Sequence, residues 1–201
     1  EKKRIPTRDN IFTCIDALVT MNHRAGFING EGDGVGIHID IPRELWKKKL
    51  QDKDVDANLA DSKQFVVGHF FLNQKENSSK LQAEIKEKLL QASLTILFEN
   101  DKTYNSSALG PIAIQENPIF WQIACISNNL TNQDLSNILF TLTHTIEEND
   151  NIHVASLSQY HSVYKVMGAG DILPKYYTDL ADPLVASTMT LGHNRFSTNT
   201  L

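Results

Sequence analysis

This sequence has few cysteines, no long apolar segment and no excess of positive charge. Its 201 residues include two cysteines, Cys14 and Cys125, which form no disulfide framework and suit a reducing compartment. Because no apolar run approaches the length of a membrane span and no signal peptide is visible, we expect a cytoplasmic protein without a membrane partner. The net charge of −5 argues against a nucleic-acid partner, since binding phosphates requires a clustered positive face.

The common motifs for metal and nucleotide binding are missing too. The histidines form neither an H-E-x-x-H motif nor a Cys/His cluster, so we expect no metal site. The glycines from Gly30 to Gly36 do not fit the spacing G-x-G-x-x-G, and they precede a strand instead of joining a strand to a helix. We therefore interpret them as a tight loop that approaches another backbone closely, not as a phosphate loop.

Composition and periodicity predict one globular domain of the α+β class. Apolar residues make up 41% of the chain and charged residues 21%, which is typical of a soluble globular protein of one domain. Helical spacing of apolar residues predicts helices over residues 7–22, 42–50, 79–92, 131–146 and 174–180. Strand patterns cover residues 35–41, 65–72, 94–98, 119–126, 154–157 and 163–166, and a final strand leads to Arg195. Residues 51–63 are expected to form a loop. Because helices and strands occur in groups, a layered α+β domain is favoured over a doubly wound sheet.

The closing stretch carries the strongest candidate for a binding site. Arg195 follows a β-prone run and is flanked by Ser197, Thr198 and Asn199. A guanidinium can hold a carboxylate through two parallel hydrogen bonds, and the hydroxyl and amide side chains can add neutral ones. The same arginine could instead pair with an acid in the core, and these residue types alone leave both readings open.

Several segments of the chain resemble one enzyme family in the same order. The stretch H-x-R-F-S-T-N-T at residues 193–200 resembles the glutamine-binding segment of the glutaminase domain of the glutamate synthase large subunit, a class II glutamine amidotransferase. Further matching segments lie at residues 21–26, 32–36, 156–158, 163–165 and 176–180. The resemblance therefore covers nearly the whole chain.

The resemblance implies a fold and a substrate site. The fold would be the four-layer αββα sandwich of the N-terminal-nucleophile hydrolases, forming a single partial domain over residues 1–201 that is incomplete at both termini. Arg195 would bind the α-carboxylate of L-glutamine, assisted by Thr198 and Asn199. His193, Asp33 and Gly34 would support the site structurally. The family usually has threonine where this chain has Glu31, so the local detail of that loop is expected to differ.

The family's chemistry uses groups that this sequence does not contain. A class II amidotransferase attacks glutamine with an N-terminal cysteine whose α-amine is the general base, and an Asn-Gly pair forms the oxyanion hole. Here residue 1 is glutamate, so we expect the nucleophilic cysteine upstream of Glu1 and the oxyanion segment downstream of Leu201. Cys14, within a helix, and Cys125, within an apolar strand, are predicted to be structural. We therefore expect no catalytic residue and no glutaminase activity in the chain as given.

The predicted function follows from these expectations. The parent protein would hydrolyse glutamine to glutamate and ammonia for a synthase domain or subunit, as part of nitrogen metabolism. FMN, iron–sulfur and NADPH sites would belong to other domains or subunits, with no cofactor in this one. One alternative is a non-catalytic glutamine-binding or assembly module that kept the fold. A third reading is an unrelated small-molecule-binding domain with a structural arginine.

Overall fold

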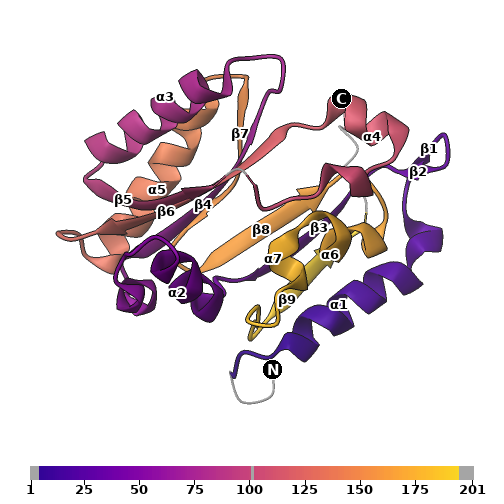
Figure 1. The fold of residues 1–201 in the computed structure, drawn as a ribbon, viewed down its shortest axis with the longest axis horizontal. Helices are drawn as coiled ribbons and strands as arrows, with labels where there is room; N and C mark the ends of the chain where they lie inside the picture. Colours follow the sequence, from indigo (N-terminus) through magenta and orange to yellow (C-terminus); the bar gives the residue numbers. More distant parts are fainter. Residues whose placement is uncertain (1–4, 101, 195–201) are drawn as a thin grey trace. The chain divides into compact units, whose positions relative to one another are not determined.

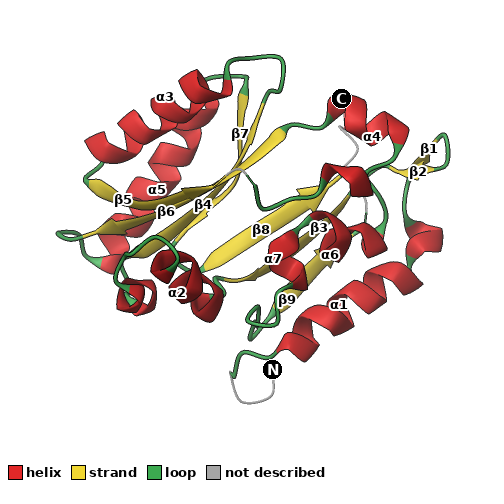
Figure 2. Cartoon of the chain, in the orientation of Figure 1, coloured by secondary structure: helices red, strands yellow, loops and turns green. Residues whose placement is uncertain are grey.

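The computed structural model describes residues 5–100 and 102–194, and it contains both helices and antiparallel sheets (Figures 1 and 2). The chain forms two compact units, each built from separated segments. The first unit comprises Glu1–Asp40, Tyr104–Asn117 and Val163–Leu201, and the second comprises Ile41–Thr103 and Pro118–Ser162. The chain therefore leaves each unit and returns to it, a topology that hydrophobic periodicity does not reveal.

A four-stranded antiparallel sheet is the centre of the second unit. Its order is β5 (Leu94–Asn100), β6 (Ile119–Ser127), β4 (Phe65–Leu72) and β7 (Ile152–Ser158). The predicted strand at residues 65–72 is confirmed at both ends, and β4 pairs along its whole length with β6. β4 is almost entirely buried, which explains its continuous apolar sequence.

Helices cover both faces of this sheet. α3 (Ser78–Gln91) and α5 (Asn132–Glu147) lie on one face, and Thr131 caps α5 through its side chain. α2 (Arg43–Gln51) lies on the other face, where Trp46 packs edge-on against Phe65. The segment predicted as a loop at residues 51–63 includes a 3₁₀-helix, η2 (Ala57–Asp61), whose first turn is capped by a side chain. A polar sequence can therefore form a helical turn when a capping residue precedes it.

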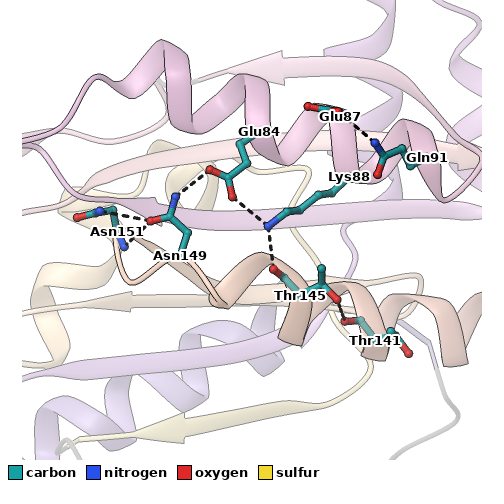
Figure 3. A network of polar contacts seen from close by, with 8 residues as sticks. All are labelled: Glu84, Glu87, Lys88, Gln91, Thr141, Thr145, Asn149 and Asn151. Carbon is teal, nitrogen blue, oxygen red and sulfur yellow. Dashed lines mark hydrogen bonds and ion pairs between the residues drawn. The ribbon is translucent and has the colours of Figure 1, made fainter.

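A polar network joins α3 to α5 on the face of the sheet that these two helices cover (Figure 3). The Nζ of Lys88 donates to Glu84 Oε1 at 2.9 Å and to the carbonyl of Thr145 at 2.8 Å, while Asn149 Nδ2 donates to Glu84 Oε2 at 2.8 Å. The hydrogen bond from Lys88, followed by that from Asn149, lowers the pKa of Glu84. These contacts fix how the two helices lie against one another.

A buried polar chain crosses the α2 side of the same sheet. Lys49 Nζ donates to Gln122 Oε1 at 2.8 Å, and Gln122 Nε2 lies 3.0 Å from His69 Nε2. His69 and Gln122 are fully buried. The amide nitrogen of Gln122 is a donor, so in this contact His69 Nε2 is positioned as the acceptor. These hydrogen bonds give the buried polar groups of Gln122 and His69 partners, and burying such groups without partners would destabilise the core.

The first unit contains a three-stranded sheet in the order β8 (His161–Val166), β3 (Val35–Asp40), β9 (Thr190–His193). The predicted strand over residues 35–41 is confirmed, with Val35, Ile37 and Ile39 buried on one face. β9 pairs antiparallel with β3. α1 (Arg8–Thr20), capped by Thr7 as its N-cap, packs along β9 (Figure 1).

Short elements complete this unit. They are η1 (Asn22–Arg24), the hairpin strands β1 (Phe27–Ile28) and β2 (Glu31–Gly32), η3 (Ser106–Ala108), α4 (Pro111–Glu116), η4 (Gly170–Ile172), α6 (Leu173–Tyr176) and α7 (Thr178–Ala181). The single helix predicted over residues 174–180 is wrong, because Tyr177 has extended backbone angles that separate α6 from α7. The Tyr177 side chain is buried, and its hydroxyl donates to the carbonyl of Lys165. Burial of this ring in the tertiary structure is therefore favoured over a continuous helix through residue 177.

Candidate functional site

The predicted substrate-binding residues Arg195, Thr198 and Asn199 lie outside the described residues. The strand before them is described, and it ends at His193. In the register of β3 and β9, His193 is opposite Gly36, two residues after Gly34. Of the predicted supporting residues, His193 therefore lies on β9, and Gly34 lies directly before the neighbouring strand β3.

α1 lies directly against β9 because position 192 is a glycine. A Cβ atom at Gly192 would lie 2.7 Å from Cys14 Sγ and 3.1 Å from Leu18 methyl carbons, so a side chain there would require Cys14 and Leu18 to shift. Beyond the strand, Asn194 Nδ2 donates to the carbonyl of Leu18 at 2.9 Å. Residues 192–194 are thus fixed to the last turns of α1.

Asp40 holds the other end of β9. Its Oδ2 accepts hydrogen bonds from the backbone N–H and the hydroxyl of Thr188, each at 2.6 Å. The backbone N–H of Asp40 donates in turn to the hydroxyl of buried Ser187 at 3.0 Å. These bonds lie next to the pairing of Ile39 with Thr190, so they fix the register in which β9 joins β3.

The segment that precedes β9 is held by the start of α1. The Arg8 guanidinium donates to backbone carbonyls of Leu180, Ala181, Asp182 and Val185. Asn10 Nδ2 donates to the carbonyls of Ser187 at 2.8 Å and Thr188 at 3.2 Å. Sequence reasoning missed both residues, because their partners are backbone atoms more than 170 positions away and leave no local pattern.

The glycine-rich loop folds as a hairpin whose shape depends on Asp33. Asn29 and Gly30 have φ angles of 50° and 86°, the left-handed conformation that a two-residue hairpin turn requires. Asp33 N–H donates to the carbonyl of Gly26 at 2.9 Å, and its carboxylate occupies the space where a side chain at Gly26 would lie. Gly34 is buried where this loop enters β3. The supporting roles of Asp33 and Gly34 at a glutamine site remain predictions.

Glu31 fixes the same loop to α4. Its two carboxylate oxygens accept hydrogen bonds from the backbone N–H groups of Ile112 at 2.9 Å and Ala113 at 3.1 Å. Gly32, next to it, lies so close to the backbone of Gly168 that a Cβ atom would be 2.5 Å from its carbonyl carbon. The expected close backbone approach is thus present. The carboxylate contact was not predicted, since α4 is 81 positions away.

Two hollows lie beside the β1–β2 hairpin and the sheet β8–β3–β9. One, of about 190 Å³, lies between the β1–β2 hairpin and residues 167–175, with Glu31 and Lys175 among its lining residues. The other, of about 350 Å³, lies on the sheet β8–β3–β9 and is lined by His38, Lys165 and His193 together with apolar groups. Of the predicted site residues that are described, His193 alone lines one of these hollows.

Neither cysteine has the character of a nucleophile. Cys125 is fully buried in β6, and burial raises the pKa of its thiol far above the ordinary value. Cys14 is half-buried against β9, and burial raises the pKa of its thiol as well. Because the thiolate is the reactive form, both thiols are poorly suited to attack an amide. The predicted structural role of both cysteines is supported.

No group of three or more histidine, cysteine or acidic side chains that could hold a metal occurs among residues 5–100 and 102–194. Across the same part of the chain, no helix combines the length and apolar character needed to span a membrane.

Comparison with known proteins gives a consistent result across the chain. The family model described as glutamine amidotransferases class-II matches residues 2–201. The chain is 31% identical to a ferredoxin-dependent glutamate synthase of Pyropia yezoensis, over 95% of this chain and 13% of that protein. It is 30% identical to ferredoxin-dependent glutamate synthase 2 of Synechocystis, over 98% of this chain and 13% of that protein. Identity to the glutamate synthase [NADPH] large chain of Bacillus subtilis is 28%, over 96% of this chain and 13% of the relative. The chain therefore spans about 13% of the length of these relatives.

Proposed function

Because this chain belongs to the class-II glutamine amidotransferases, we propose that it is the glutaminase domain of a glutamate synthase. In this role it binds L-glutamine, and the complete domain releases glutamate and ammonia. The ammonia passes to a synthase domain or subunit, where FMN, iron–sulfur and NADPH chemistry would reside. The proposal includes a single domain over residues 1–201, the four-layer αββα sandwich and a cytoplasmic location.

The observation that carries the proposal is the way β9 is anchored. Asp40 fixes one end of this strand, and the contact of Asn194 with α1 fixes the other. A binding group is effective when the backbone that presents it does not move, because less conformational freedom is lost when the ligand binds. Arg195 is the residue immediately after this anchored stretch. We assign the α-carboxylate of glutamine to its guanidinium, with Thr198 and Asn199 as further donors.

The catalytic nucleophile is assigned to a cysteine outside this sequence. Cys125 is buried and Cys14 is held against Gly192, so neither thiol suits an attack on the side-chain amide of glutamine. An N-terminal cysteine would use its own α-amine, whose pKa is about 8, as the general base. The proposal therefore expects glutamine binding by these 201 residues without turnover.

Calorimetric titration of the chain with L-glutamine tests the binding assignment. Arg195→Ala should weaken binding by at least tenfold, since a charge-assisted hydrogen bond contributes about 1.5–3 kcal/mol. Arg195→Lys should restore binding only in part, because an ammonium lacks the planar fork. Lys63→Ala, an exposed position in the second unit, is the control and should not alter the affinity. Equal glutamine affinity in the wild type and Arg195→Ala would disprove the assignment.

A second candidate is a non-catalytic glutamine-binding or assembly module, which the unreactive setting of both thiols favours. The product of the natural gene distinguishes the two functions. Release of glutamate from glutamine by that product supports the glutaminase. Glutamine binding without any release of glutamate supports the module.

A further inference from the structure

The larger hollow lies on the face of the sheet β8–β3–β9 that is opposite α1. Gly192 faces Cys14 and Leu18 of α1, so its neighbours Leu191 and His193 project to the other side of β9. On β3, Gly36 and His38 are opposite His193 and Leu191 and share that side. Lys165 joins them from β8, since a Cβ atom at Gly36 would lie 3.4 Å from Lys165 Cγ.

Gly36 leaves the middle of this face open. The residue has no side chain, and it lies between Lys165 on one neighbouring strand and His193 on the other. The resulting space has a volume of about 350 Å³, enough for a small metabolite. Val163 and Leu191 supply apolar walls.

Among residues 5–100 and 102–194, the titratable side chains that line this hollow are all basic, although the whole chain carries a net charge of −5. They are His38, Lys165 and His193. No carboxylate in the described part of the chain forms an ion pair with Lys165. The acid nearest along β3 on this face is Asp40, and its carboxylate already accepts two hydrogen bonds from Thr188.

We propose that this hollow binds a small organic carboxylate, with Lys165 as the charged group that receives it. An ammonium in a concave, partly apolar setting attracts an anion more strongly than one in open water, because the effective dielectric constant is lower. His38 and His193 can add N–H donors, since even a neutral imidazole carries one. The apolar walls favour an acid with a short aliphatic chain over a fully hydrated inorganic anion. The proposal assigns this carboxylate to Lys165, whereas the proposed function assigns the α-carboxylate of glutamine to Arg195.

Titration of the chain with glutarate, glutaramide and inorganic phosphate tests the proposal. Glutarate has the expected charge and aliphatic chain, whereas glutaramide has the same carbon chain without charge. A ligand of this size should bind with a Kd on the order of 1 mM. We expect glutarate to bind at least tenfold more tightly than glutaramide, and more tightly than phosphate. Chemical shift changes should centre on the ring protons of His38 and His193.

Lys165→Met removes the charge and keeps most of the aliphatic side chain, and it should weaken glutarate binding by at least tenfold. Lys175→Met is the matched control, because Lys175 is exposed and pairs with Asp171, and it should bind glutarate as the wild type does. Gly36→Ala gives a second approach, since its Cβ makes an ordinary contact with Lys165 while occupying the floor of the hollow. It should weaken binding several-fold without unfolding the chain.

Three outcomes would overturn the proposal. They are unchanged glutarate affinity in Lys165→Met, equal affinity for glutaramide and glutarate, and tighter binding of phosphate than of glutarate. Arg195→Ala separates this site from the glutamine site, because it should weaken glutamine binding by at least tenfold and leave glutarate binding intact. Failure of glutamine to bind would therefore count against the proposed function alone.

Discussion

Replacing Asp40 by alanine should destabilise the first unit more than the loss of an exposed ion pair does. The carboxylate accepts the N–H and the hydroxyl of Thr188, each at 2.6 Å, beside the last paired residues of β3 and β9. A hydrogen bond to a charged group contributes about 1.5–3 kcal/mol when it is shielded from water. Asp40 is half-buried, so water can replace part of this interaction. We therefore expect a loss of about 2 kcal/mol for the two bonds together.

Urea denaturation followed by circular dichroism measures this loss, and a thermal scan should show a decrease in Tm of about 4–8 °C. Native-state hydrogen exchange adds a local readout, because the amide of Thr188 should lose its protection in Asp40→Ala. A double-mutant cycle with Thr188→Val isolates the hydroxyl contact and should give a coupling energy of about 0.5 kcal/mol or more.

Asp171→Ala is the control in the same unit. Asp171 pairs with Lys175 on the surface, where the two side chains are 52% and 63% exposed, and such pairs contribute about 0.5 kcal/mol or less. If Asp40→Ala costs no more than Asp171→Ala and the Thr188 amide stays protected, the register of β9 does not depend on this carboxylate.

Two further substitutions test other contacts. Gly110→Ala would place a Cβ 2.3 Å from the carboxyl carbon of Glu31, so we expect a loss of about 1–3 kcal/mol in urea denaturation. The loss should shrink in a Glu31→Ala background, and an equal loss there would show that Glu31 is not the obstacle. The hydrogen bond from Lys88 lowers the pKa of Glu84 in the folded chain, so its contribution is present above the ordinary value of 4.5 and is lost as the pH falls through the lowered pKa. Glu84→Gln should therefore be less stable than the wild type at pH 7 and approach it near pH ~3, and a constant difference across that range would refute the linkage.

The local sequence specified most helices and strands of this chain. β4 is confirmed at residues 65–72 because a continuous apolar run can be buried on both faces of a central strand. α5 follows Thr131 because an N-cap side chain and a periodic apolar stripe act within a few residues of one another. The ordered family segments also belong to the sequence, and the match to the family model extends over residues 2–201.

Local patterns failed where distant groups determine the conformation. The helix predicted over residues 174–180 is interrupted because burial of Tyr177 and its bond to Lys165 outweigh helical propensity. Glu31 stands where the family usually has threonine, and its carboxylate accepts the N–H groups of Ile112 and Ala113 in the first turn of α4. No spacing in the sequence relates these groups, since their separation along the chain is unrelated to their separation in space.

At β9 it is clearest which features the local sequence determines and which ones depend on the tertiary structure. The sequence by itself determined that a β-prone run precedes Arg195 and that hydroxyl and amide groups follow it. Only the tertiary structure decided that Asp40 and the glycine at 192 hold that run against β3 and α1. It also decided that Lys165 lines the same hollow as His193. The physical reason is that side-chain chemistry is local, whereas register and close approach arise only when distant strands pack together.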